Sequence, residues 1–318
     1  MQFKKLKAPK PSHMKIIQAG QEIRTDPEPN PADIAFMARQ LVQATLPHSD
    51  PGKVESWKRT NGNLTLRIRP GWDHQKDQSL GYPYGVIPRL LLFWITTEAL
   101  RTGSRRLYLG SSLAAFMRAL GLDPDNGSTG AKRSDARRLK DQMMRLFQAT
   151  ISFDRIADGR HQWLNMQIAP EGSMCLWWDF NDTSQEDLFS SWIDLNERFF
   201  QAITSAPVPV DMRALHALKR SPLALDLYAF VSYRAYVATQ TGKAQFITWA
   251  QLMGQLGADY SDVDNFRKKT KAALRKIKSV YPGLKLGPKQ GGIQILPGAS
   301  AVSPKPAKRQ LSPPSEGG

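Results

Sequence analysis

Hydrophobic and polar positions separate most clearly between residues 261 and 281. At helical pitch one stripe is largely apolar and contains Val263, Phe266, Thr270, Leu274, Ile277 and Tyr281. Another stripe is cationic and contains Lys268, Lys271, Arg275 and Lys278. Ser261 is predicted to cap this helix, with Asp264 as the capping-box acid three residues later. The pattern predicts a helix with one face for a core and one face for anions.

The segments around this helix place it in a larger unit. Residues 245–247 favour a short strand, and residues 248–257 favour a short helix that ends at a glycine. Residues 284–286 and 292–296 flank a basic turn and predict a hairpin. This is the element order of a winged helix, whose second helix enters the major groove of DNA. The alternative is a surface helix whose lysines keep it solvated.

The first half of the chain repeats the same order. A long apolar helix from Ile87 to Leu100 precedes a strand at 106–109 and a helix that begins after Ser111. Residues 131–147 then form a second basic, two-sided helix. Two strands follow at 150–156 and 162–168, and residues 221–233 supply the matching apolar helix of the second half. The fold class predicted is therefore α+β, with two tandem winged-helix domains and a disordered tail at each end.

Proline-rich and low-complexity segments set the expected boundaries. Residues 34–46 predict a helix, residues 57–68 a hairpin, and residues 205–210 a semi-rigid linker with two prolines. The predicted parts are a disordered tail at 1–30, a first winged-helix domain at 31–205, a second at 206–297, and a disordered basic tail at 298–318.

Composition points to a polyanionic partner. The 318 residues include 44 Lys and Arg against 28 Asp and Glu, a net charge of +16 with 41% hydrophobic residues. Nucleic acid is the leading candidate. A membrane is the rival, but no apolar run is long enough to span a bilayer. The N-terminus lacks a secretory signal, so we expect a cytoplasmic protein. The single cysteine, Cys175, excludes an intramolecular disulfide and is interpreted as a buried apolar residue.

Residues for catalysis are sparse. The five histidines are scattered, no metal or cofactor site is predicted, and residues 127–134 miss the spacing of a phosphate-binding loop. An acidic cluster is interpreted as a solvated connection, although it leaves a metal-dependent DNA nickase as an alternative: Asp179, Asp182, Glu186 and Asp187. We predict that the protein is not an enzyme.

The two basic helices predict contact with double-stranded DNA. Each could occupy a major groove, with the two grooves about one helical turn, roughly 10 bp, apart. Arginines such as Arg133 and Arg137 suit guanine, whereas lysines suit phosphates. The predicted DNA-binding residues are Lys132, Arg133, Arg137, Arg138, Lys140, Arg267, Lys268, Lys271, Arg275, Lys278 and Lys289.

Three segments, at 84–99, 116–122 and 138–143, resemble the plasmid-encoded replication initiator family RepA, and the likeness runs from about Tyr82 to Trp249. The resemblance implies theta-type plasmid replication: binding to directly repeated origin sequences, opening of adjacent A·T-rich DNA, and recruitment of the host replication initiator and replicative helicase. It also implies autorepression by a homodimer. A plasmid transcription repressor with the same architecture remains the alternative. The family contributes no catalytic motif, so the DNA-facing residues depend on helical geometry alone.

Overall fold

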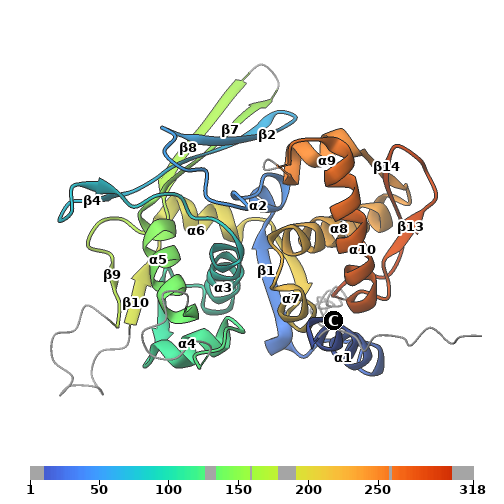
Figure 1. Ribbon diagram of the computed structural model, residues 1–318, viewed down its shortest axis with the longest axis horizontal. Helices are drawn as coiled ribbons and strands as arrows, with labels where there is room; N and C mark the ends of the chain where they lie inside the picture. The colour runs from blue at the N-terminus through green and yellow to red at the C-terminus, as the bar shows by residue number, and fades with distance from the viewer. Residues whose placement is uncertain (1–10, 126–133, 158–159, 178–190, 258–259, 303–318) are drawn as a thin grey trace, which may run out of the picture.

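Helices and strands of the computed structural model combine in a mixed α/β arrangement (Figure 1). The structure describes residues 11–125, 134–157, 160–177, 191–257 and 260–302. Buried hydrophobic residues from the whole of this part of the chain pack into one continuous core. The two halves of the chain are therefore in direct contact.

A four-stranded antiparallel sheet of order β2-β3-β7-β8 lies in the first half. Its strands are β2 (Trp57–Asn61), β3 (Leu64–Arg69), β7 (Thr150–Ala157) and β8 (Arg160–Gln167). Both predicted hairpins are confirmed. In β3, Leu64, Leu66 and Ile68 are buried while the residues between them are not, which is the alternation expected of a sheet with one face on the core. A small separate hairpin follows β3, formed by β4 (Trp72–Asp73) and β5 (Gln78–Ser79).

The helices of the first half surround α3 (Val86–Thr102), which is buried along most of its length, as its apolar sequence predicts. Strand β6 (Arg106–Gly110) leads into α4 (Leu113–Ala119) and α5 (Asp135–Gln148). The N-cap of α4 is Ser112, so the prediction of Ser111 was wrong by one residue. Strand β6 pairs with β10 (Ser191–Asp194), which also pairs with β9 (Met174–Cys175).

The second half has the predicted order of elements. They are α8 (Pro222–Thr241), β12 (Gln245–Thr248), α9 (Trp249–Leu256), α10 (Val263–Val280), β13 (Lys285–Gly287) and β14 (Gly292–Leu296). Its antiparallel sheet has the order β12-β14-β13, so the strand before the two helices pairs with the last strand of the hairpin. In the first half β6 pairs with β10 instead of with the β7–β8 hairpin. The halves share an order of elements but not a sheet topology.

The segments predicted as an N-terminal helix and a linker form a sheet together. After a 3-10 turn, η1 (Pro31–Asp33), β1 (Ile34–Ala38) pairs antiparallel with β11 (Pro207–Asp211), and only the short α2 (Arg39–Gln43) is helical. The prediction of a helix at 34–46 was thus right only for residues 39–43 and wrong for 34–38 and 44–46, and the linker at 205–210 is largely a strand. Two prolines fit in β11 because it pairs on one side only and needs few N–H donors.

Both tails are shorter than predicted. Residues 11–25 form α1 (Pro11–Thr25), which buries Ile16, Ala19 and Ile23 against the core. Near the other end, the Tyr281 hydroxyl donates to the carbonyl of Ala299 at 2.9 Å and Val302 is buried. The prediction of disorder was therefore wrong for residues 11–25 and for the start of the C-terminal tail. Residues 1–10 and 303–318 lie outside the described part of the chain.

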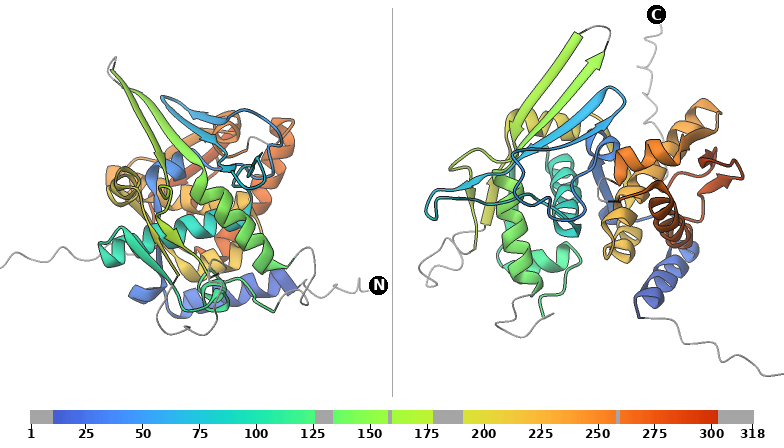
Figure 2. Two further views of the ribbon diagram at one scale, coloured as in Figure 1. Left: turned by 90° about the vertical axis from the view of Figure 1, so that its left-hand side faces the viewer. Right: turned by 45° about the horizontal axis from the view of Figure 1, so that its top comes forward.

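Two further helices complete the fold: α6 (Glu197–Thr204) packs against α3, and α7 (Met212–Leu218) packs against α1. A buried ion pair links the halves, because Arg89 of α3 donates to both carboxylate oxygens of Asp226 of α8, each at 2.8 Å. Since α5 packs on α3 and α10 packs on α8, this arrangement fixes the two basic helices relative to each other. Figures 1 and 2 show α5 and α10 on the same side of the molecule.

Candidate nucleic-acid interface

Helix α10 presents the two faces that its sequence predicts, with corrections at its start. The N-cap is Asp262, whose carboxylate accepts from the Asn265 N–H at 2.6 Å, in place of Ser261. Val263 is 38% exposed, so it does not belong to the apolar stripe. The other stripe residues are buried and hold the helix on the core: Phe266, Thr270, Leu274, Ile277 and Tyr281.

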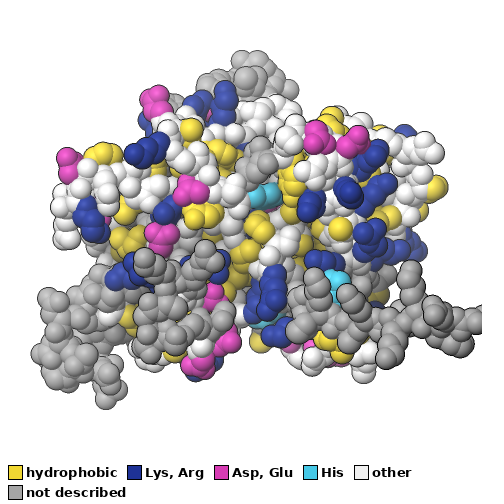
Figure 3. All heavy atoms as spheres, in the orientation of Figure 1, with side chains coloured by type: hydrophobic (Ala, Val, Ile, Leu, Met, Phe, Trp, Pro, Cys, Tyr) yellow, Lys and Arg dark blue, Asp and Glu magenta, His cyan; other side chains and the backbone are white. Residues whose placement is uncertain are grey.

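The cationic face of α10 is exposed and borders a groove. Arg267, Lys268, Lys271, Arg275 and Lys278 are all exposed. A groove of about 610 Å³ runs between this face and the β13–β14 hairpin, and four of the five cations line it, with Lys289 on the opposite wall. Lys268 projects from the same helix outside the groove. Figure 3 shows the Lys and Arg side chains gathered over the region that α10 and the hairpin occupy in Figure 1.

Aromatic rings position two of these lysines. The Lys271 ammonium lies 5.8 Å from the centre of the Trp249 ring, and the Lys289 ammonium lies 4.3 Å from the centre of the Phe246 ring. A cation over an aromatic face keeps its charge and loses little hydration, so it stays available to an anion. The predicted site did not include these aromatics. Their position just before the basic helix was the available signal.

The carboxylates nearest to α10 leave most of its charge uncompensated. Arg267 forms an ion pair of 3.1 Å with Asp264, and both side chains are exposed. An exposed pair of this kind is worth little and exchanges readily for another anion. Gln290 and Gln294 also line the groove and supply amide donors and acceptors. The groove is therefore suited to a phosphate backbone with bases beside it.

Helix α5 carries the other predicted cations. Ser134 caps it by accepting from the Arg137 N–H at 3.3 Å, and Arg137, Arg138 and Lys140 are exposed. Arg138 forms an ion pair of 3.0 Å with Asp135. Lys132 and Arg133, predicted on the first turn of this helix, lie outside the described residues. The structure thus brings five predicted residues together at the groove and places three more on a second helix of the same face.

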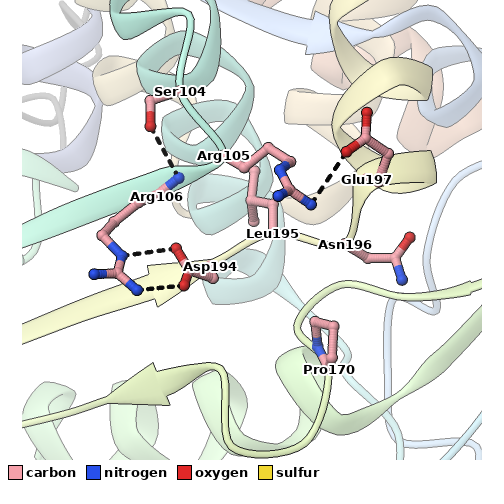
Figure 4. A pocket seen from close by; sticks show the side chains of 8 residues that line it. All are labelled: Ser104, Arg105, Arg106, Pro170, Asp194, Leu195, Asn196 and Glu197. Carbon is pink, nitrogen blue, oxygen red and sulfur yellow. Dashed lines mark hydrogen bonds and ion pairs between the residues drawn. The ribbon is translucent and has the colours of Figure 1, made fainter.

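A second pocket that contains arginines differs from the α10 groove, because carboxylates compensate its positive charge (Figure 4). It has a volume of about 530 Å³ and includes Arg105 and Arg106. Arg106 donates to both carboxylate oxygens of Asp194, at 2.9 and 2.6 Å, and Arg105 pairs with Glu197 at 3.2 Å. The hydrogen bond from Arg106 lowers the pKa of the Asp194 carboxyl. Its arginines are matched by acids, so this pocket has little charge to offer an anion.

No metal site emerges from the described residues: no three His, Cys, Asp or Glu side chains gather where they could hold an ion. The acidic cluster of the nickase alternative, residues 179–187, lies outside the described residues. Cys175 lies in β9 and is partly buried, so it is less buried than the sequence predicted. Within the same described ranges, no helix has the length and hydropathy to cross a bilayer.

Comparison with protein families gives a match over the middle of the chain. The family described as "Plasmid encoded RepA protein" matches residues 82–251, which is more than half of the chain. No curated protein and no solved structure matches. The matched range includes α5, the first basic helix, with α3 beneath it, and α8, on which α10 packs; it ends before α10 itself.

Proposed function

The chain belongs to the plasmid-encoded RepA family and is thus a plasmid replication protein, and from this premise we propose that it is an initiator that binds double-stranded origin DNA. The observation that carries the proposal is the exposed cationic face of α10 beside the β13–β14 hairpin. A cationic helix flanked by a strand hairpin has the two parts that a duplex needs, one for the major groove and one for the adjacent backbone.

The second half supports a winged-helix interpretation in its connectivity. Helix, strand, two helices and a hairpin follow in order, and β12 pairs with β14 in a three-stranded antiparallel sheet. In this interpretation α10 is the recognition helix and β13–β14 is the wing. Lys271, Arg275 and Lys278 face the groove between them, where they would meet the phosphates on either side of the helix.

The first half would supply the second DNA contact through α5. Its hairpin β7–β8 follows the basic helix, as a wing would, but is joined to β2–β3. The proposal of tandem winged helices therefore depends, in this half, on the order of elements and on the position of α5. Since α5 and α10 lie on one side (Figures 1 and 2), we propose that they occupy successive major grooves of directly repeated sequences.

Origin opening, recruitment of the host replication initiator and the replicative helicase, a homodimeric repressor form, cytoplasmic location and the absence of enzymatic activity complete the proposal. Origin opening, recruitment and the repressor form are supported by the family's link to plasmid replication, whereas cytoplasmic location and the absence of enzymatic activity are expectations from the sequence alone. The exposed basic face supports only the DNA-binding step, and that step is the one to test first.

The test is titration of a labelled origin fragment at several salt concentrations, with a shuffled fragment as control. The informative variant replaces Lys271, Arg275 and Lys278 with glutamine. Each phosphate contact contributes about 0.9 to the slope of log K against log salt. We therefore expect weaker binding and a slope smaller by roughly 2 to 3. Arg198→Gln is the matched control, since Arg198 is exposed on α6, which packs against α3 and β1.

Equal affinity of the wild-type chain for origin and shuffled fragments would remove the initiator proposal. Origin binding without origin-dependent plasmid maintenance would favour the transcription repressor. Cleavage of supercoiled DNA in the presence of Mg²⁺, abolished by substitution of Asp179 or Asp182, would favour the nickase.

A further inference from the structure

A second cationic cavity lies between the two basic helices. It has a volume of about 590 Å³ and is lined by residues from α1, α3, α5, α7, α8 and α10. Arg138 of α5 and Lys276 of α10 both line it, so it spans the distance between the two helices on the face that they share. None of the sequence patterns predicted it, because each helix contributes at most three residues and the connections between helices supply the others.

The cavity has more positive than negative charge. Five cations line it, Lys15, Arg138, Lys219, Arg220 and Lys276, against two carboxylates, Asp123 and Asp135. Asp135 already pairs with Arg138 at 3.0 Å. Among the described residues, no carboxylate lies within ion-pair distance of the other four cations. An excess of positive charge therefore remains in the cavity, and Lys219 at the end of α7 and Lys276 of α10 contribute to it.

Lys219 is the residue most affected by this excess. It lies half-buried at the C-terminus of α7. Burial, together with the charges of Lys15 and Arg220, lowers the pKa of its ammonium group, and Asp135 and Asp123 only partly oppose this effect. A cation held among like charges gains more from an added anion than an isolated surface lysine does. The position of Lys219 thus favours a bound anion.

The walls of the cavity also fit a phosphate. Ser221 and Ala224, which line the cavity, lie at the N-terminus of α8, so the positive end of the dipole of this 20-residue helix borders the cavity. Ser221 caps the helix by accepting from the Ala224 N–H at 3.2 Å. The floor is apolar, with Ile16, Ile87 and Leu218 buried beneath the cations. An apolar floor under several cations strengthens their interaction with an anion by keeping water away from one side.

We propose that this cavity binds phosphates of the DNA backbone between the segments read by α5 and α10. The inference rests on the proposed function, because it takes duplex DNA as the partner. If α5 and α10 both enter grooves of one duplex, the DNA between those grooves must pass over the surface between the two helices. Lys219, Arg220 and Lys276 lie on that surface. The cavity then acts as a third contact that fixes the path of the backbone and reads no bases.

The experiment pairs a protein variant with a modified DNA. Uncharged methylphosphonate linkages replace single phosphates between the two half-sites of an origin fragment. Binding is measured for the wild type, Lys219→Gln, Lys276→Gln and the control Arg198→Gln. At the contacted phosphates we expect the wild type to lose affinity on the order of tenfold, the equivalent of about 1.4 kcal/mol for one charge-assisted contact. Lys219→Gln should show the same loss on unmodified DNA, and little further loss on the modified DNA.

Origin and shuffled fragments should be affected equally by Lys219→Gln, since a phosphate contact carries no base preference. Additive losses at every linkage, or wild-type affinity in both cavity variants, would overturn the proposal while leaving the initiator function intact. Absence of origin binding by the wild type would instead overturn the proposed function itself.

A second experiment tests ATP and pyrophosphate as small-molecule ligands of the cavity. Binding of either that depends on Lys219, with unchanged DNA affinity in Lys219→Gln, would assign the cavity to a phosphorylated metabolite and refute the backbone contact. Circular dichroism of each variant checks that it is folded.

Discussion

The substitution Asp226→Asn removes one charge from the buried ion pair between α3 and α8 and should destabilise the whole protein. Arg89 is 2% exposed, and all three nitrogens of its guanidinium group donate hydrogen bonds. Besides the two bonds to Asp226, it donates to the carbonyls of Leu46, Pro47 and Gly85 at 2.7, 2.9 and 2.6 Å. Loss of the carboxylate therefore leaves a buried guanidinium that cannot turn elsewhere.

Two arguments give the size of the effect. Burial alone would raise the pKa of the Asp226 carboxyl, but Arg89 and the hydrogen bond from His48 hold it at about 2, below its ordinary 3.8. That difference corresponds to roughly 2 kcal/mol at neutral pH. Removal of one partner from a buried pair costs about 3–5 kcal/mol. We favour the larger range, because an asparagine amide also places a donor against the donors of Arg89.

The assay is denaturant unfolding followed by far-ultraviolet circular dichroism at pH 7 and again near pH 3. We expect Asp226→Asn to lower the unfolding free energy by about 3 kcal/mol or more at pH 7, and by less at pH 3, where the wild-type carboxylate begins to lose its advantage. The double variant Arg89→Met with Asp226→Leu should lose less than the sum of the single variants. A loss below about 1 kcal/mol at pH 7 would refute the reasoning.

The same variant tests how the halves are held for DNA. Each base pair inserted between two half-sites rotates one against the other by about 35°. If the ion pair fixes the relative position of α5 and α10, wild-type binding falls steeply with one inserted base pair, and Asp226→Asn tolerates the insertion better. Identical dependence on spacing in both proteins would show that other contacts set this geometry.

Two further predictions concern stability. Burial and the charge of Arg89 lower the pKa of His48, although the hydrogen bond that the ring donates to Asp226 opposes this effect. The neutral ring therefore stabilises the fold above the ordinary pKa of 6.5, and the unfolding free energy should decline as the pH falls below that value. The decline should be smaller in His48→Gln, and equal declines in both proteins would contradict the assignment. Gly20→Ala should destabilise by about 1–3 kcal/mol in thermal unfolding, because its Cβ would meet the Ser279 carbonyl of α10. Gly254→Ala in α9 is the control, because the added Cβ would point into open space; it should be neutral or stabilising by up to about 1 kcal/mol. Equal changes in thermal stability for Gly20→Ala and Gly254→Ala would contradict the α1–α10 contact.

Local periodicity predicted most helices and hairpins because their hydrogen bonds and stripes lie within one segment. It failed at β1 and β11, whose partners are more than 160 residues apart in the chain. The apolar spacing at 34–46 fits a helix as well as a strand when the partner strand is unknown. In α1, Ile16, Ala19 and Ile23 do have helical spacing, but the polar and proline-rich surroundings favoured disorder. Packing against α7 and α10, with a hydrogen bond from Arg24 to the Ser279 carbonyl, stabilises the segment, which would lack this support alone.

The site divides in the same way. The cations of α10 could be predicted because one helix carries them at regular spacing, and Lys289, predicted in the basic turn, lines the same groove. The cavity around Lys219 could not, because its charges come from separate helices that only the folded chain brings together. Whether α5 and α10 share a face likewise depended on the packing of α3 against α8. The tandem winged-helix assignment stays a prediction, with sheet topology in its favour for the second half alone.

The pairing of β1 with β11 has a practical meaning for anyone who wishes to dissect the molecule. Residues 39–206 connect β1 to β11, and the pairing of these two strands brings the ends of the connection together. Five residue pairs form this ladder, from Ile34 opposite Asp211 to Ala38 opposite Pro207. A truncation that starts at residue 206 would remove the one strand that pairs with β11 in the described part of the chain and would expose more of Val208 and Val210. Residues 207–211 are thus a paired strand and not a flexible linker. The C-terminal half needs β1, from the N-terminal part of the chain, to complete this sheet.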